Sequence, residues 1–128
     1  TGRARRAAHR AEEPLWRWGH RAEMPREYGP SNPPKSHELY AGSKVIADRC
    51  FEQNLAFYKC KDASENPASC LEVGKAVHAC VHTALGDIEK KAPAEFRSYA
   101  YCLEVNALKM EECRTKQLAF ESAYFGSS

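Results

Sequence analysis

Four of the six cysteines stand at equal intervals along the chain, and this spacing limits the possible folds more than any other feature. Cys50, Cys60, Cys70 and Cys80 are each separated by nine residues. On an α-helix, ten positions advance about 15 Å and complete close to three turns, so the two cysteines of one helix lie near the same face. Because sulfur atoms that far apart cannot bond within one helix, any bridge must join two helices.

Antiparallel packing of the two helices selects one of the three pairings that four cysteines allow. The early cysteine of one helix then faces the late cysteine of the other, which predicts the bridges Cys50–Cys80 and Cys60–Cys70. Their loops of about thirty and about ten residues should each add roughly 2.5 to 4 kcal/mol of stability. Zinc binding and reduced, buried thiols are the alternatives, but no Cys-x2-Cys pair occurs, and six thiols at regular spacing would be an unusual accident.

The chain is poor in the large apolar residues that normally form a core. Leu, Ile, Val and Phe together make up only 20 of the 128 residues. That is thin for a packed domain of this size. Disulfides, metals or a partner surface usually supply the missing stability, and the cysteines are the obvious candidates.

The last two cysteines, Cys102 and Cys113, are separated by ten residues and are expected to form a third bridge. If this segment copied the first hairpin, an outer bridge would join the positions that Ala92 and Ala123 occupy. Both members of that outer pair are small and both lack sulfur. A joint loss is what a bridge predicts, because one leftover thiol would be reactive or would mispair.

Apolar residues at helical spacing predict four helices after residue 43. Asn66 and Pro67 form a start signal, with Asn66 as N-cap and Pro67 at the first helical position. This second helix is expected to end near Gly86, and Pro93 is expected to open the third. The stripes that define the four helices are Ile46, Cys50, Phe57 and Cys60; Cys70, Val73, Val77, Cys80, Val81 and Ala84; Phe96, Tyr99 and Leu103; and Met110, Cys113, Gln117 and Phe120.

The predicted fold class is all-α, with two disulfide-stapled antiparallel hairpins preceded by an extended, largely irregular N-terminal arm. The arm contains both Trp and five of the seven Pro and has no sustained period, so it cannot close a core of its own. The expected segments are the basic arm 1–43, the first hairpin 44–86, the second, similar hairpin 87–124 and the tail 125–128.

The arm is the expected contact with other proteins. Residues 1–45 hold nine Lys or Arg against five Glu, whereas the rest of the chain holds ten basic and twelve acidic residues. Aromatic side chains in such a segment are costly to leave in water and suggest anchors on a partner. Folding back onto the hairpins is the alternative for the two Trp, and the arginines before Glu12 also have transit-peptide composition. The expected anchors are Trp16, Trp18, Tyr28 and Tyr40.

No metal or cofactor site is expected. His78 and His82 lie four residues apart on one predicted helix and could in principle share a metal. Their neighbour Cys80 is assigned to a bridge, however, and no carboxylate completes the set, which favours a solvated or helix-capping role. The chain also lacks the Cys-Cys dipeptide that suits Cu(I) and any redox-active Cys-x-x-Cys.

The sequence contains no arrangement typical of an enzyme. The acidic pairs Asp87 with Glu89 and Glu111 with Glu112 are expected on exposed faces, because nothing defines a pocket between them. A Gly-rich phosphate loop, a nucleophile elbow and an HExxH string are absent. The net charge of +2 gives no reason to expect nucleic acid, and no apolar run reaches the roughly 18 residues of a membrane span.

Equal nine-residue cysteine spacings on a helical hairpin resemble the twin Cys-x9-Cys, or CHCH, family. Two hairpins in tandem are similar to a narrower family of accessory subunits, the PGIV type, of mitochondrial NADH:ubiquinone oxidoreductase, which is respiratory complex I. The resemblance covers about residues 43–124. It is carried by three strings, Cys70-Leu-Glu-Val-Gly-Lys-Ala-Val77, Phe96-Arg-Ser-Tyr-Ala-Tyr-Cys102 and Cys113-Arg-Thr-Lys-Gln-Leu-Ala-Phe120.

This resemblance implies a non-catalytic accessory subunit that stabilises the membrane arm of complex I on its intermembrane-space face. It implies oxidised cysteines, other complex I subunits as partners, peripheral attachment to the inner membrane, and oxidative import machinery during biogenesis. The alternatives are a free intermembrane-space assembly factor or metal-handling protein with the same hairpin, and a secreted helical binding protein, which the missing signal peptide disfavours. The missing outer pair and the ten-residue inner spacing depart from the family pattern in the second hairpin.

Overall fold

The computed structural model describes residues 26–126, and the regular structure within that range is helical apart from one antiparallel bridge between Gly29 and Asn32. The predicted all-α fold class is therefore confirmed. No helix in this range is both long enough and apolar enough to cross a bilayer. In chain order the helices are α2 (Ser36–Ala41), α3 (Ser43–Arg49), α4 (Phe51–Ala63), the 3-10 turn η1 (Pro67–Cys70), α5 (Leu71–Lys91), α6 (Pro93–Val105), the 3-10 turn η2 (Met110–Cys113) and α7 (Arg114–Phe125).

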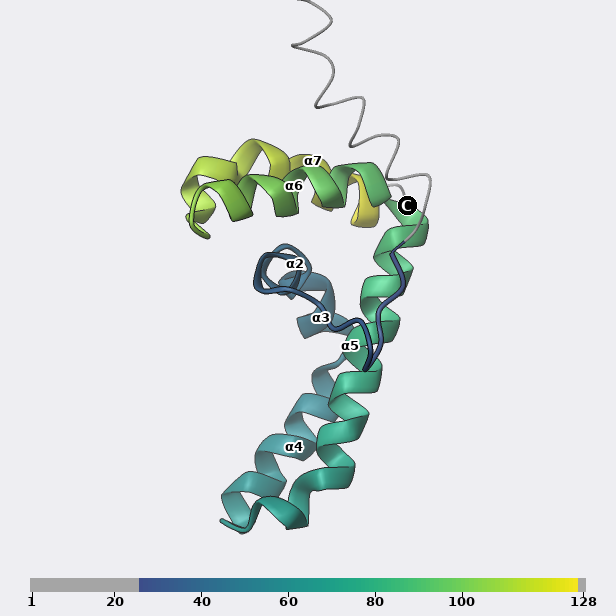
Figure 1. The fold of residues 1–128 in the computed structure, drawn as a ribbon, viewed down its shortest axis with the longest axis vertical. Coiled ribbons are helices and arrows are strands. Elements are labelled where there is room, and N and C mark those ends of the chain that lie inside the picture. The colour runs from purple at the N-terminus through teal and green to yellow at the C-terminus, as the bar shows by residue number, and fades with distance from the viewer. Residues whose placement is uncertain (1–25, 127–128) are drawn as a thin grey trace, which may run out of the picture.

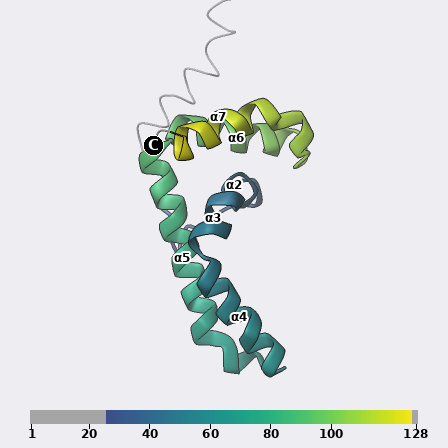
Figure 2. The same cartoon turned by 180° about the vertical axis from the view of Figure 1, so that it is seen from behind.

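Helix α5 runs through both parts of the molecule and contacts α3, α4, α6 and α7. Figures 1 and 2 show α4 lying beside one half of α5, while α6 and α7 lie together across its other end and α2 and α3 fill the angle between them. Helix α4, the half of α5 next to it and Cys50 at the start of α4 make up the stapled hairpin, which we define as residues 50–80. The remaining helices and the last part of α5 make up the body, residues 36–49 and 81–125.

The first predicted helix is bent at Cys50. Instead of one helix through Ile46, Cys50, Phe57 and Cys60, the chain forms α3 and α4, which meet at Cys50 with φ −110° and ψ 21°. The backbone hydrogen bonds still run through the bend, from the Cys50 amide to Ile46 and from the Asn54 amide to Cys50. The bend lets α3 turn into the body while α4 stays with α5.

The prediction that the second helix ends near Gly86 is wrong, because α5 continues to Lys91. A glycine inside a helix costs about 1 kcal/mol relative to alanine. Burial of one large apolar side chain stabilises by about 1.5 to 3 kcal/mol, and Leu85 and Ile88, on either side of the glycine, are both fully buried. Packing against the body therefore outweighs the local preference for a helix end.

The two hairpins repeat the same local plan. Asn66 is confirmed as the cap of the turn before α5, since its side chain accepts a hydrogen bond from the Ala68 amide at 3.1 Å. Pro93 is confirmed as the first residue of α6. The second turn holds the extra residue of the ten-residue cysteine spacing, and it does so with two left-handed residues, Ala107 at φ 55° and Leu108 at φ 64°.

The core lies almost wholly in the body. Its buried side chains include the predicted stripe of α6 and its partners on α7, and within 50–80 only Cys50 and Cys70 are buried. Helix α4 has no buried residue at all. The buried core residues are Ala41, Val45, Cys50, Ala84, Leu85, Ile88, Ala92, Phe96, Tyr99, Ala100, Leu103, Cys113, Phe120 and Tyr124.

The arm is less irregular than predicted up to residue 43, because it contains the helix α2. The Glu38 side chain accepts a hydrogen bond from the Lys35 amide at 2.7 Å, which closes the first turn of this helix. The body side of α2 buries Glu38 and Ala41. Gly42 then allows a close approach, since a Cβ at that position would lie 2.9 Å from Leu85.

Candidate functional site

Three disulfides join the helices. They are Cys50–Cys80, Cys60–Cys70 and Cys102–Cys113, with Cα–Cα distances of 5.8, 5.9 and 5.9 Å, which suit a disulfide. These are the pairs that the spacing predicts. The first two hold both ends of the stapled hairpin, and the third holds the turn between α6 and α7.

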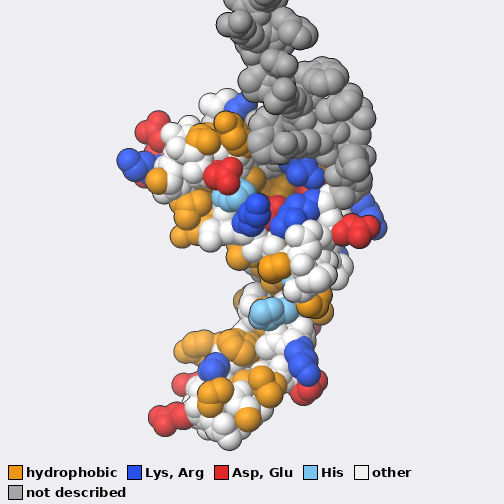
Figure 3. All heavy atoms as spheres, in the orientation of Figure 1, with side chains coloured by type: hydrophobic (Ala, Val, Ile, Leu, Met, Phe, Trp, Pro, Cys, Tyr) orange, Lys and Arg blue, Asp and Glu red, His pale blue; other side chains and the backbone are white. Residues whose placement is uncertain are grey.

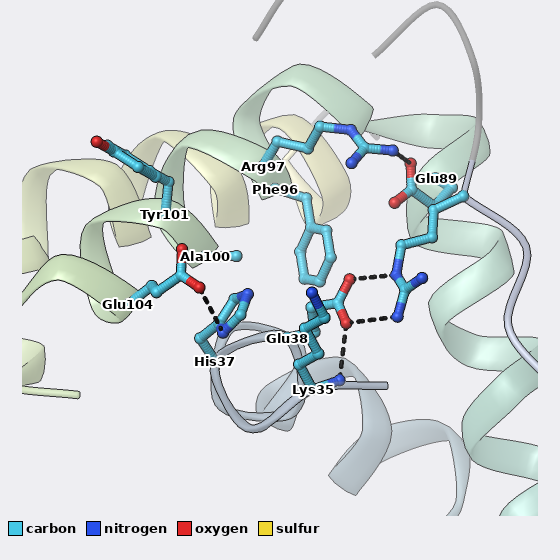
Figure 4. A pocket seen from close by; sticks show the side chains of 10 residues that line it. Lys35, His37, Glu38, Glu89, Phe96, Arg97, Ala100, Tyr101 and Glu104 are labelled. Atoms are coloured by element: carbon cyan, nitrogen blue, oxygen red, sulfur yellow. Dashed lines mark hydrogen bonds and ion pairs between the residues drawn. The ribbon is translucent and has the colours of Figure 1, made fainter. Parts of the chain in front are cut away.

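The arm is held to the body by a network of charged groups that the sequence reasoning missed. The Arg26 guanidinium donates a hydrogen bond to each carboxylate oxygen of Glu38, and the bond from Nη2 to Oε1 is 2.9 Å long. It also donates to the Asn32 side chain at 2.8 Å and to the Pro33 carbonyl at 3.0 Å. Figure 4 shows Glu38 pointing from α2 toward the extended segment before it. One arginine therefore fixes the course of residues 26–38.

A second carboxylate, Glu89 of α5, connects the arm to the long helix. The Tyr28 hydroxyl lies 3.0 Å from a Glu38 oxygen and 3.3 Å from a Glu89 oxygen. Arg97 of α6 donates to the other Glu89 oxygen at 3.3 Å, as Figure 4 shows. We call Arg26, Tyr28, Glu38, Glu89 and Arg97 the clasp. It links the arm, α2, α5 and α6.

The clasp shifts the pKa values of its two carboxylates in opposite directions. Burial acts to raise the pKa of Glu38, but the hydrogen bonds from Arg26 and from the Lys35 backbone outweigh it and hold that pKa below its ordinary value. Burial raises the pKa of Glu89, and the nearby Arg97 only partly offsets this. Burial also raises the pKa of Tyr28 above its ordinary value, which is itself well above neutral pH, and its hydroxyl is a hydrogen-bond donor there.

The expectation that Asp87 and Glu89 lie on an exposed face is wrong for Glu89, which is only 3% exposed. Asp87 is partly covered as well, because it accepts a hydrogen bond from the Tyr124 hydroxyl at 2.6 Å and pairs with Arg49 at 2.8 Å. These contacts tie α3, α5 and α7 together. The prediction of an exposed face is confirmed for Glu111 and Glu112.

A signal for Glu89 was present in the sequence. It follows Leu85 and Ile88 at helical spacing, so it falls on the apolar face of α5. A carboxylate at a core position needs a partner that donates hydrogen bonds. That partner could not be named from the pattern, because Tyr28 lies 61 residues earlier in the chain.

The expected anchors of the arm divide into three cases. Trp16 and Trp18 lie outside the described residues. Tyr28 is half-buried and takes part in the clasp, with the Arg26 guanidinium 4.7 Å from its ring centre. Tyr40 is 47% exposed and remains a predicted partner contact.

The two histidines of α5 do not form a metal site with other residues of the described range, 26–126. No group of three or more His, Cys, Asp or Glu is placed there to hold a metal ion. The rings of His78 and His82 lie 6.5 Å apart, edge to face. His78 is exposed and His82 is half-exposed, so both meet solvent along α5.

The stapled hairpin exposes several of its large apolar side chains. Phe51, Leu55 and Tyr58 recur at helical spacing on α4 and are 61%, 38% and 68% exposed, and Leu71 of α5 is 59% exposed. Figure 3 shows hydrophobic side chains gathered over this part of the molecule. Apolar side chains grouped in this way mark a surface for binding another molecule.

Comparison with known proteins identifies the family, although no family model matches the chain. The chain is 42% identical to NADH dehydrogenase (ubiquinone) 1 alpha subcomplex subunit 8-A of Arabidopsis thaliana over 94 residues. These matched residues are 73% of this chain and 87% of that protein. The 8-B subunit of the same plant is 40% identical over 88 residues, 69% of this chain and 83% of that protein. The NADH-ubiquinone oxidoreductase 20.8 kDa subunit of Neurospora crassa is 33% identical over 107 residues, 75% of this chain and 57% of that protein. The chain thus belongs to the family of alpha subcomplex subunit 8 of NADH dehydrogenase (ubiquinone).

Proposed function

We propose that this chain is a non-catalytic accessory subunit of mitochondrial complex I that stabilises the membrane arm on its intermembrane-space face. Membership of the subunit 8 family is the observation that carries the proposal, because the relatives are named as subunits of that enzyme. Its partners are then other complex I subunits. The chain contributes surface and rigidity to the assembly and takes no part in electron transfer.

The stapled hairpin is suited to this mechanical role. Two bridges fix α4 against α5 at both ends, so the hairpin loses little conformational freedom when it docks. Its apolar side chains stay on the surface and remain available to a neighbour. A rigid, apolar surface of this kind stabilises an assembly through contact alone.

The three bridges support the intermembrane space as the compartment. Disulfides persist where the surroundings are oxidising and are rare in reducing compartments. Oxidative import machinery would then form the bonds during biogenesis. We also retain the division into an arm, a first hairpin at 44–86 and a second at 87–124 as a proposal, with α5 continuous across the boundary.

Native-gel fractionation of mitochondrial membranes with mass spectrometry tests this function. The chain should migrate with NADH dehydrogenase activity, and its removal should lower the amount of assembled complex I. Mass measurement of the isolated protein without reductant should find six hydrogens fewer than in the reduced chain, one pair for each bridge. Migration only as a small free species would contradict the subunit role and favour a free assembly factor.

A further inference from the structure

An apolar groove runs along the stapled hairpin, and no contact described above uses it. It follows one face of α5 from Leu71 to His82, with α4 on one side, and its volume is about 820 Å³. The loop that carries Pro30 and Pro33 closes one end, and Pro67 lies at the other. Eleven helical steps from 71 to 82 give a length of about 16 Å.

The floor of the groove is formed where Phe57 packs against α5. A Cβ at Gly74 would lie 3.5 Å from the Phe57 ring, an ordinary van der Waals distance, so the ring lies directly against the backbone of α5. Leu71 adds an exposed aliphatic side chain one turn earlier. The result is an apolar strip, open to solvent, on a hairpin that its disulfides hold in shape.

Every ionisable side chain that lines the groove is basic. They are Lys61 of α4 with Lys75, His78 and His82 of α5, and no Asp or Glu is among the lining residues. The Lys61 ammonium lies 5.7 Å from the centre of the Phe57 ring. Lys75 pairs with Glu72 at 3.3 Å, but both side chains are largely exposed, so this pair is weak. The groove therefore combines an apolar floor with a rim of two lysines and two imidazoles.

We propose that this groove binds an amphipathic helical segment of a neighbouring complex I subunit, with apolar residues on one face and carboxylates beside them. The inference rests on the proposed function, which supplies the neighbour. An amphipathic helix places apolar anchors at the third, fourth and seventh positions, and about three turns of it fit a length of about 16 Å. Carboxylates along its edges meet the basic rim.

The placement of the basic residues favours a polypeptide over an anionic lipid. Lys75, His78 and His82 are spread over about 10 Å of α5, and Lys61 stands beside them on the other helix. A lipid carries its charge at one end, whereas a helix can present carboxylates along its whole length. The rim therefore matches carboxylates spread along a helix, which the lysines attract and to which the imidazoles can donate hydrogen bonds.

Photo-cross-linking in the intact assembly tests the proposal. A photoreactive amino acid replaces Leu71 in the groove in one variant, and in the control it replaces Leu55, an exposed leucine of the same hairpin that does not line the groove. After irradiation of mitochondria, complex I is isolated and the cross-linked peptides are sequenced. The Leu71 probe should capture one segment of another subunit that has an apolar helical face flanked by Asp or Glu. The Leu55 probe should not capture that segment.

Charge reversal is the second test of the proposal. Lys61→Glu in the probe-bearing chain should lower the yield of the Leu71 cross-link by about fivefold, because an attraction becomes a repulsion. Lys59→Glu makes the same charge change on the same helix, outside the groove, and should leave the yield unchanged. Equal effects of the two variants would contradict the claim that binding in the groove depends on the charge of Lys61.

The other occupants are distinguishable. A Leu71 cross-link to lipid, to residues 1–25 of this chain, to a segment without carboxylates, or to nothing would overturn the proposal while the chain still migrates with complex I. A chain that never migrates with complex I contradicts the proposed function instead. The Leu71 probe is then used in the assembly that does contain the chain. Capture of a segment with an apolar helical face flanked by Asp or Glu supports the groove as its binding site, and any other product contradicts it.

Discussion

The stapled hairpin and the hairpin of α6 and α7 have the same local plan but different sources of stability. The stapled hairpin has two disulfides, and its only buried residues are Cys50 and Cys70, which belong to those bridges. The other hairpin has one disulfide and buries an aromatic cluster. Bridges and core thus substitute for one another within a single chain.

Core packing takes the place of a disulfide at Ala92 and Ala123, the positions of the missing outer bridge. Ala92 is 1% exposed and Ala123 packs against the core, so the outer end of this hairpin is closed by packing. The ring of Phe120 lies 5.4 Å from Phe96, 6.2 Å from Tyr99 and 6.1 Å from Tyr124, measured between ring centres. Loss of the outer bridge therefore does not leave this hairpin loose.

The largest expected effect comes from the centre of that cluster. Phe120→Ala should lower the free energy of unfolding by about 3 to 5 kcal/mol, because it removes a buried ring and leaves a cavity. Phe51→Ala is the matched control in the stapled hairpin, where the ring is 61% exposed, and should change stability by less than about 0.5 kcal/mol. Urea denaturation of both variants measures the difference, and equal losses would contradict the contrast.

The inner bridges provide a matched pair of covalent tests. Cys60→Ser with Cys70→Ser and Cys102→Ser with Cys113→Ser open loops with sequence separations of 10 and 11. Each pair should cost about 2.7 kcal/mol through the unfolded chain.

The location of the effect should nevertheless differ between the two pairs. Amide exchange should accelerate through α4 in the first variant, whereas α6 and α7 should stay protected in the second, because the aromatic cluster still holds them. Equal local opening in both variants would show that the core does not compensate for a bridge.

The clasp makes the stability of the body depend on pH. The pKa of Glu38 is lower in the folded chain than in the unfolded one, so its contribution is present above about pH 4.3 and is lost as the pH falls through the folded value. The pKa of Glu89 is raised, so its contribution has the opposite sign and is lost as the pH rises through its folded value.

Replacement of Glu38 distinguishes its contribution to the pH dependence of stability from that of Glu89. Glu38→Gln should cost about 1.5 to 3 kcal/mol at pH 7, because it removes charged hydrogen bonds to Arg26, and the difference from the native chain should shrink below about pH 4. Urea denaturation between pH 3 and pH 7 measures this. Glu111→Gln, at an exposed position, is the control. A difference that stays constant with pH would contradict the clasp.

The smallest effect is expected at the surface of the body. Lys44 of α3 and Glu121 of α7 form an ion pair at 3.3 Å, and the lysine side chain is 66% exposed. Lys44→Ala should therefore change stability by only about 0.5 kcal/mol, and less at high salt. A loss above about 2 kcal/mol would mean that surface charge, and not the core, holds α3 against α7.

Local patterns predicted the elements whose cause is local. Equal cysteine spacing indicated the pairs that the structure contains, and Asn66 and Pro93 marked two helix starts. Phe96 and Tyr99 fell on the buried stripe of α6. The helix starts and the stripe depend on residues within a few helical turns of one another, and the pairing of Cys50 with Cys80, 30 residues apart, follows from the equal spacing on two neighbouring helices.

Features that depend on distant residues could not be predicted in this way. The end of α5 is set by packing of Leu85 and Ile88 against the body, which outweighs the preference of Gly86. Similarly, Tyr28 meets Glu89 only because α2 returns the arm to α5 and α6. Without the tertiary arrangement, a tyrosine in a proline-rich arm was predicted to contact another protein.

Hydrogen exchange of the whole chain, compared before and after reduction of its three disulfides, tests the central claim most directly. The claim predicts that reduction removes protection from the amides of α4 and of the first half of α5, while amides of α6 and α7 stay protected by the aromatic cluster. Protection that persists in α4 after reduction, or that disappears from both hairpins together, would contradict it.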